Sequence, residues 1–111
     1  MKKTFIIVVG FLFSSNVFAV GEVNNAKVVA VRADKTGKGY VKFDRTLSGT
    51  PASCIKDHNN HLSFDLNTAG GQGIMSVALS AYATGREVRA KGTGTCDEYS
   101  VVESWSFGYV R

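Results

Sequence analysis

The chain has 111 residues, of which 44% are hydrophobic, and this size and composition fit one small globular domain. Its formal net charge is +4, from thirteen basic and nine acidic residues. No run of five like charges occurs, so there is no polybasic tail. A basic excess this mild argues against a nucleic-acid-binding protein.

The N-terminus has the layout of a secretory signal peptide. Lys2 and Lys3 precede an apolar run over 5–13, and the short residues Val17 and Ala19 stand at the −3 and −1 positions of the expected cleavage site. The apolar run is too short to span a membrane. We expect cleavage after Ala19 and a periplasmic or secreted mature chain over 20–111, with no membrane span. Both lysines leave with the signal, so eleven basic residues then face nine acidic ones and the net charge falls to +2.

The two cysteines, Cys54 and Cys96, predict one disulfide, because an isolated pair in an exported chain is most simply bridged. Such a bridge stabilises a small domain by roughly 4 kcal/mol in the chain-entropy model. The alternative is a zinc site, which needs four ligands and so the two histidines as well.

Three strands are predicted in the first half of the mature chain. The β-branched run over 28–31 and the alternating run over 40–43 are separated by a turn-forming segment at 34–39, which indicates a β-hairpin. A polar segment over 47–60 holds the only proline and predicts a long loop. The alternation over 62–66 predicts a third, half-buried strand.

A helix follows. Apolar residues recur at helical spacing on one face, at Ile74, Val77, Ala78, Ala81 and Tyr82. The glycines at 70, 71 and 73 are expected to precede this helix, and Gly85 stands where a C-terminal capping glycine ends one.

Two further strands complete the domain, at 88–91 and 101–110, and the side chains of Trp105, Phe107 and Tyr109 are expected to enter the core from one face. The element order is then β-β-β-α-β-β. This is the order of an OB-fold, a five-stranded Greek-key barrel, which we expect over 20–111 as a single domain.

The helix carries no charge over 67–85, although a helix on a small soluble barrel normally has a charged outer face. This composition suits packing against another helix in an oligomer. The alternative is that the helix only closes one end of the barrel. The expected oligomer contacts are Gln72, Met75, Ser76, Leu79 and Ala83.

Aromatic and basic side chains on outward strand faces and a loop are the candidate ligand contacts: Arg32, Tyr40, Lys42 and Tyr99. OB-folds bind ligands on the face of their second and third strands and on neighbouring loops. The segment 57–61 holds two histidines and an aspartate, but its spacing fits no metal motif, and we expect solvated histidines. No nucleophile elbow or phosphate-binding loop is present, so we expect no enzyme, no cofactor and no metal.

The segments 63–65, 81–88 and 92–96, together with Glu103, resemble small exported bacterial OB-fold proteins related to the receptor-binding B subunits of subtilase cytotoxin and pertussis-type toxins. The resemblance implies a non-catalytic domain that forms a ring of five around its helices. It also implies binding to cell-surface glycans and a catalytic A-type partner chain.

The sequence therefore favours an exported binding module for carbohydrate or a host surface. Two alternatives stay open. One is a stand-alone protein of the cell envelope or an inhibitor of a secreted enzyme. The other is single-stranded nucleic-acid binding, which the fold alone suggests and which the charge and the exported location oppose.

Overall fold

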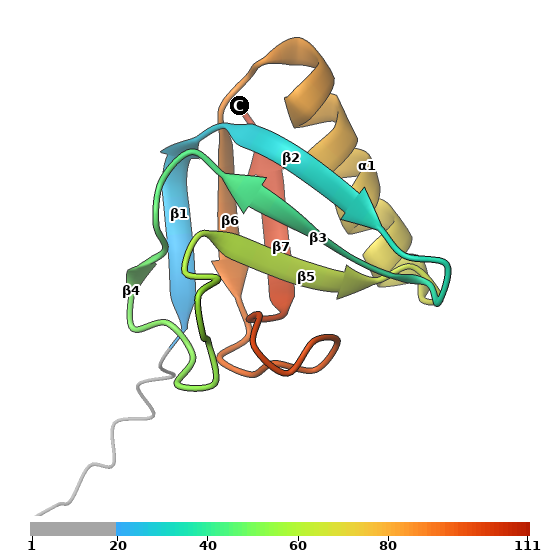
Figure 1. Ribbon diagram of the computed structural model, residues 1–111. Helices are drawn as coiled ribbons and strands as arrows, with labels where there is room; N and C mark the ends of the chain where they lie inside the picture. The colour runs from blue at the N-terminus through green and yellow to red at the C-terminus, as the bar shows by residue number, and fades with distance from the viewer. Residues whose placement is uncertain (1–19) are drawn as a thin grey trace, which may run out of the picture.

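The computed structural model describes residues 20–111, and the predicted signal peptide over 1–19 lies outside the described residues. The domain is mainly β with one helix, which confirms the predicted class. No helix within 20–111 is long and apolar enough to cross a bilayer. The elements are β1 (Gly21–Ala26), β2 (Val28–Ala33), β3 (Lys38–Phe43), β4 (Ser48–Gly49), β5 (His61–Asp65), α1 (Ala69–Thr84), β6 (Val88–Gly92) and β7 (Trp105–Val110) (Figure 1).

The strands form two open antiparallel sheets, ordered β4-β1-β6-β7 and β2-β3-β5, and the second sheet lies across the first (Figure 1). The predicted order β-β-β-α-β-β is wrong, because the sequence analysis missed β1 and β4. β1 contains two consecutive asparagines, and Asn25 has a φ of 54°, so its pattern is not that of a regular strand. β4 is only two residues long.

Two features join the sheets. Lys27 alone separates β1 from β2, so one nearly continuous strand passes from the first sheet into the second. At the other side an isolated parallel bridge links Ser63 of β5 to Ser104, just before β7. Its hydrogen bond runs from the Ser63 amide to the Glu103 carbonyl oxygen, 2.9 Å away.

The core lies between the two sheets and the helix. Val41, Phe43 and Leu62 are fully buried, as period-two alternation requires of the inner face of a sheet. Trp105 packs against Phe43 and Phe64, with ring centroids 5.8 and 6.4 Å apart. The strands predicted around these residues therefore have the expected inner face.

The helix α1 has a well-formed cap at each end. The Thr68 hydroxyl oxygen accepts from the Gly71 amide at 2.9 Å, and Gly85 adopts a φ of 70° to close the last turn. Its C-terminal end is as predicted, but its start is not. Gly70, Gly71 and Gly73 lie inside the helix rather than before it, because the N-cap is Thr68. Gly71 packs so closely on the Asp65 carbonyl that a Cβ there would lie 1.7 Å from its oxygen.

The buried face of α1 differs from the predicted stripe. Ala78 and Ala81 are buried as expected, but Tyr82 is 55% exposed. Met75, which we expected on the outer face, is partly buried and packs against the core. The helix is thus rotated toward Met75, and Leu79 remains outside with 47% exposure.

The last strand differs from the prediction in two ways. β7 begins at Trp105 rather than at 101, and it contains a bulge. Trp105 and Phe107 pair with consecutive residues of β6, so Ser106 is an extra residue. An extra residue reverses the alternation of the side chains that follow it. Trp105 is therefore buried as predicted, whereas Phe107 and Tyr109 are 47% and 45% exposed on the outer face.

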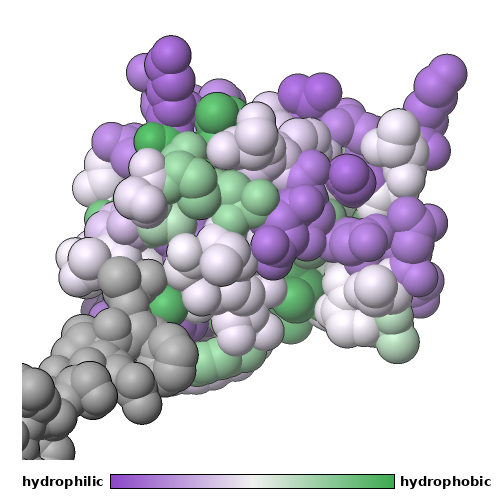
Figure 2. Space-filling model, turned by 90° about the horizontal axis from the view of Figure 1, so that it is seen from below, coloured by the Kyte–Doolittle hydropathy of each residue, from purple (hydrophilic) through white to green (hydrophobic). Residues whose placement is uncertain are grey.

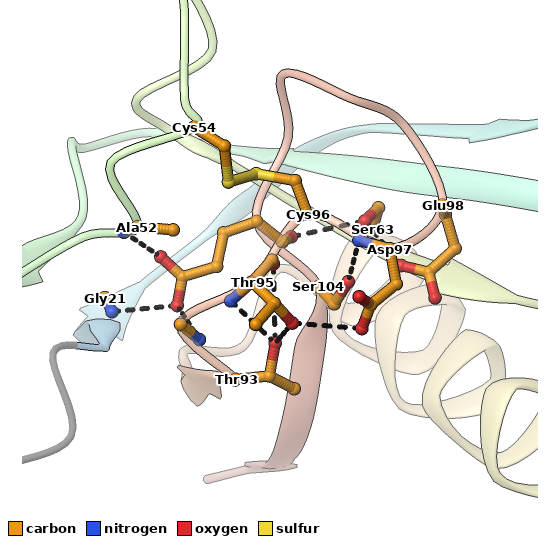
Figure 3. Close-up of a disulfide and its surroundings, with 12 residues drawn as sticks. Gly21, Ala52, Cys54, Ser63, Thr93, Thr95, Cys96, Asp97, Glu98 and Ser104 are labelled. Atoms are coloured by element: carbon orange, nitrogen blue, oxygen red, sulfur yellow. Dashed lines mark hydrogen bonds between the residues drawn. A yellow bond between two sulfur atoms is a disulfide. The ribbon is translucent and has the colours of Figure 1, made fainter.

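The predicted disulfide between Cys54 and Cys96 is present, with Cα atoms 6.3 Å apart (Figure 3). It ties the long loop before β5 to the segment between β6 and β7 and closes a span of 42 residues. A loop of that length corresponds to roughly 4 kcal/mol of stabilisation in the chain-entropy model.

Candidate functional site

Four rings converge on the outer face of the β2-β3-β5 sheet, and we call them the aromatic cluster: Tyr40, His58, His61 and Tyr99. Tyr40 is at the centre, with its ring centroid 5.4 Å from that of Tyr99 and 5.1 Å from that of His61. The rings of His58 and His61 are 4.8 Å apart. All these pairs meet edge to face, so ring faces as well as edges line the surface.

A chain of polar contacts holds one side of this cluster. Arg32 donates from Nε to an Asp34 carboxylate oxygen at 2.8 Å and from Nη1 to the Tyr40 hydroxyl at 3.0 Å. The Tyr99 hydroxyl donates to the other Asp34 oxygen at 2.5 Å. The guanidinium carbon lies 5.2 Å from the Tyr40 ring centroid, within cation–π range. Four residues from three segments are therefore fixed by one network.

The electrostatics of the network follow from these contacts. The hydrogen bond from Tyr99, followed by that from Arg32, lowers the pKa of Asp34. Burial and the same bond to Asp34 raise the pKa of Tyr99, so its hydroxyl stays protonated and acts as a donor. Hydrogen bonds to Asp34 and Tyr40 raise the pKa of Arg32, which stays charged.

His61 is the unusual titratable group of the cluster. Burial lowers its pKa to about 4, and the nearby His58 and Lys42 add to the effect. Its Nδ1 atom is buried without a hydrogen-bond partner in the described part of the chain. His58, by contrast, has its Nδ1 2.7 Å from the Lys56 carbonyl oxygen. His61 is therefore neutral at pH 7.

Strand register positions these groups. Arg32, Tyr40 and Ser63 stand opposite one another on β2, β3 and β5, and their inward neighbours fill the core. The loop before β7 brings in Tyr99. That loop is held by the hydrogen bond from the Ser63 hydroxyl to Glu98 at 2.8 Å and by the disulfide at Cys96.

The structure brings three of the predicted ligand contacts, Arg32, Tyr40 and Tyr99, into direct contact. Lys42 is exposed beside them, opposite His61 in the register of β3 and β5. The local sequence pattern does not assign Asp34, His58 or His61 to this face. It predicts only a turn at Asp34 and solvated histidines at 58 and 61. The register between β3 and β5 is what places His61 on this face. His61 stands opposite Lys42, which is two residues from Tyr40 and so on the same side of the sheet.

The metal ligands considered at 57–61 do not assemble into a metal site. Within residues 20–111 no group of three or more His, Cys, Asp or Glu side chains is placed to hold an ion. The two histidine rings pack against Tyr40 and each other, with His58 turned to a backbone carbonyl.

Of the predicted oligomer contacts on α1, all but Met75 are exposed: Gln72, Ser76, Leu79 and Ala83. The Gln72 and Ser76 side chains bond to backbone carbonyls of Leu66 and Gln72, at 3.0 and 3.2 Å. The outer face of the helix therefore offers small and apolar groups with few free polar ones.

Two cavities lie away from the aromatic cluster. One of about 480 Å³ is lined by Val20, Lys91, Thr93 and Phe107 among others, at the end of the molecule where the chain enters β1. Figure 2 shows this end, where apolar patches alternate with hydrophilic ones. The other, of about 310 Å³, lies at the start of α1. We place the candidate site at the aromatic cluster because rings and charged groups converge there.

A scan of protein-family models found no match to this chain, and searches of curated proteins and of solved structures found no similar protein.

Proposed function

We propose that this protein is an exported, non-catalytic binding module that recognises carbohydrate through the aromatic cluster. The observation that carries the proposal is the convergence of Tyr40, Tyr99, Arg32 and Asp34 on one half-exposed face. Aromatic rings pack against the apolar faces of sugars, and fixed donors and acceptors bind their hydroxyl groups. The Arg32 side chain is 55% exposed, so it can still bond to a ligand.

The architecture supports an OB-fold as the finer description. β1 and β2 would form the long first strand, interrupted at Lys27, and the Ser63–Ser104 bridge would close the barrel between the third and fifth strands. The aromatic cluster then lies on the second and third strands, β3 and β5, and on the two adjoining loops. That is the ligand-binding face of OB-folds.

We also propose a ring oligomer that packs through α1, as the resemblance to toxin B subunits implies. An exposed, uncharged helix face with Leu79 and Tyr82 outside supports this. A catalytic A-type partner chain belongs to the same proposal. Light scattering on the oxidised mature protein tests the ring, since a mass of about five subunits is expected and a monomer would contradict it.

One observation favours the alternative of a stand-alone envelope protein or an inhibitor of a secreted enzyme. Phe107 and Tyr109 are exposed on the other sheet, opposite Lys91 and Arg89 of β6. Aromatic residues and arginine are enriched at protein–protein interfaces. Stable capture of one envelope or secreted protein, lost on changing Phe107 but kept on changing Tyr40, would favour this function.

The main test is a glycan array probed with the oxidised mature protein, followed by titration of the best ligand. We expect Tyr40→Ala to weaken binding at least about tenfold, which corresponds to 1.4 kcal/mol. Tyr109→Ala is the control, because it removes an exposed tyrosine from the other sheet and should leave binding unchanged. Binding to no glycan, or equal losses in both variants, would contradict the proposal.

A further inference from the structure

Glu103 is the one fully buried charged side chain of the described domain, and the aromatic cluster does not use it. Its carboxylate accepts three backbone hydrogen bonds, from Gly21 at 2.9 Å, Ala52 at 2.7 Å and Gly94 at 3.0 Å. Figure 3 shows Gly21 and Ala52 on different segments beside the disulfide, with the dashed lines of these two hydrogen bonds converging. Both oxygens act as acceptors, as in an ionised carboxylate.

No positive side chain compensates this charge. None of the ion pairs within 20–111 includes Glu103, and its three partners are neutral amides. A buried carboxylate without a counter-charge is costly even when it is hydrogen-bonded. The surrounding backbone is also built tightly around it, since a Cβ at Gly92 would lie 1.9 Å from Oε2. The site is therefore made for a carboxylate and lacks a cation.

The start of the predicted mature chain lies beside this carboxylate. Val20 is held in place because its carbonyl oxygen accepts from the Thr50 amide at 3.1 Å. The Gly21 amide nitrogen lies 2.9 Å from Glu103 Oε2. Backbone bond lengths keep consecutive nitrogens within about 3.7 Å of each other, so the Val20 nitrogen is at most about 7 Å from the carboxylate.

We propose that Glu103 is the receptor for the α-ammonium group of Val20, which cleavage after Ala19 creates. Before cleavage this nitrogen belongs to a neutral peptide bond, and hydrolysis of the Ala19–Val20 bond converts it to an amine that takes up a proton. A unit positive charge then stands within about 7 Å of a buried unit negative charge, and the two attract each other. Processing thus supplies the missing counter-charge and completes the disulfide end of the domain.

This inference rests on the proposed export of the chain but not on its ligand, so glycan binding plays no part in its test. The exported protein is purified, and mass spectrometry establishes whether it begins at Val20. An NMR titration of its α-amino group then gives the pKa directly. We expect a value above about 9, against an ordinary value near 8. An ordinary value, or a chain that begins elsewhere, would overturn the proposal.

A second experiment displaces the α-ammonium group but keeps its charge. Inserting one serine between Ala19 and Val20 displaces the ammonium group by about 3.8 Å. We expect the melting temperature to fall by about 5 °C. The same insertion in the Glu103→Gln background, which keeps an acceptor oxygen but no charge, should have little effect. Equal falls in both backgrounds would overturn the proposal, and the titration of the parent decides the matter if Glu103→Gln does not fold.

Discussion

The disulfide end and the aromatic cluster both gather polar side chains from distant parts of the chain, but they differ in burial and in partners. At the disulfide end Glu103 is fully buried, and its partners are backbone amides. At the aromatic cluster, Tyr40 and the adjoining Arg32 bond through their side chains, and both remain partly exposed. Backbone partners cannot leave when a ligand arrives, whereas exposed side chains can exchange partners. The first region therefore maintains the fold, and the second is where we propose that a ligand binds.

Of the changes that test this difference between the two regions, removing the disulfide is expected to lower the unfolding free energy most. The double variant Cys54→Ala, Cys96→Ala should lose roughly 4 kcal/mol of unfolding free energy, because its unfolded state is no longer cross-linked. Urea unfolding measures this loss. The parent under reducing conditions is the control and should lose a similar amount. Parental stability in the double variant would contradict a stabilising role for the bridge.

The next largest loss of stability is expected where Gly92 packs closely against the Glu103 carboxylate. Gly92→Ala should cost about 3 kcal/mol of unfolding free energy, since its Cβ would collide with the buried carboxylate. Gly73→Ala is the matched control, because no atom lies within 4 Å of its added Cβ. Within a helix that control should gain up to about 1 kcal/mol. If Gly92→Ala were as stable as the parent, the tight packing around Glu103 would be wrong.

A smaller effect is expected at the aromatic cluster, where His61 makes the unfolding free energy depend on pH. The pKa of His61 is about 4 in the folded state, below its ordinary 6.5. The unfolded chain therefore binds more protons between these values, and stability falls as the pH drops from 6.5 to 4, with no further loss below. Because the ring is partly exposed, we expect a loss on the order of 1 kcal/mol.

Urea unfolding of the parent and of His61→Phe across this pH range measures that contribution. The difference in unfolding free energy between the two proteins isolates His61 from the carboxylates, which also titrate near pH 4. The variant should lack the extra loss on acidification. Parallel pH profiles for the two proteins would show that His61 is not held neutral by the fold.

The smallest effect is expected from Tyr99→Phe, which removes one hydroxyl group from the cluster. Its hydrogen bond is the main cause of the lowered pKa of Asp34, so the pKa of Asp34 should rise toward its ordinary value. The bond stabilises the fold above that ordinary pKa, and the contribution disappears as the pH falls through the folded value. An NMR titration of Asp34 measures the shift, and Tyr109→Phe is the control that should leave it unchanged.

Three structural features follow from the sequence alone. The Cys54–Cys96 bridge follows from an isolated cysteine pair, the end of α1 from Gly85, and a mainly β domain with one helix from local periodicity. Arg32 and Tyr40 could be named as surface groups because strand alternation is local, and Tyr99 because it stands in a polar loop segment. Each of these features depends on residues close together in the chain or on chemistry that only one residue type has.

Only the tertiary structure decided which of these groups meet and which faces are buried. The bulge at Ser106 turns Phe107 and Tyr109 outward, and a one-residue insertion leaves no mark in the hydrophobic pattern. The packing of α1 on the sheets, rather than its own periodicity, turned Met75 inward. His61 joined Tyr40 through the register between β3 and β5. Register, bulges and helix rotation are set by contacts between distant segments, and no local pattern encodes them.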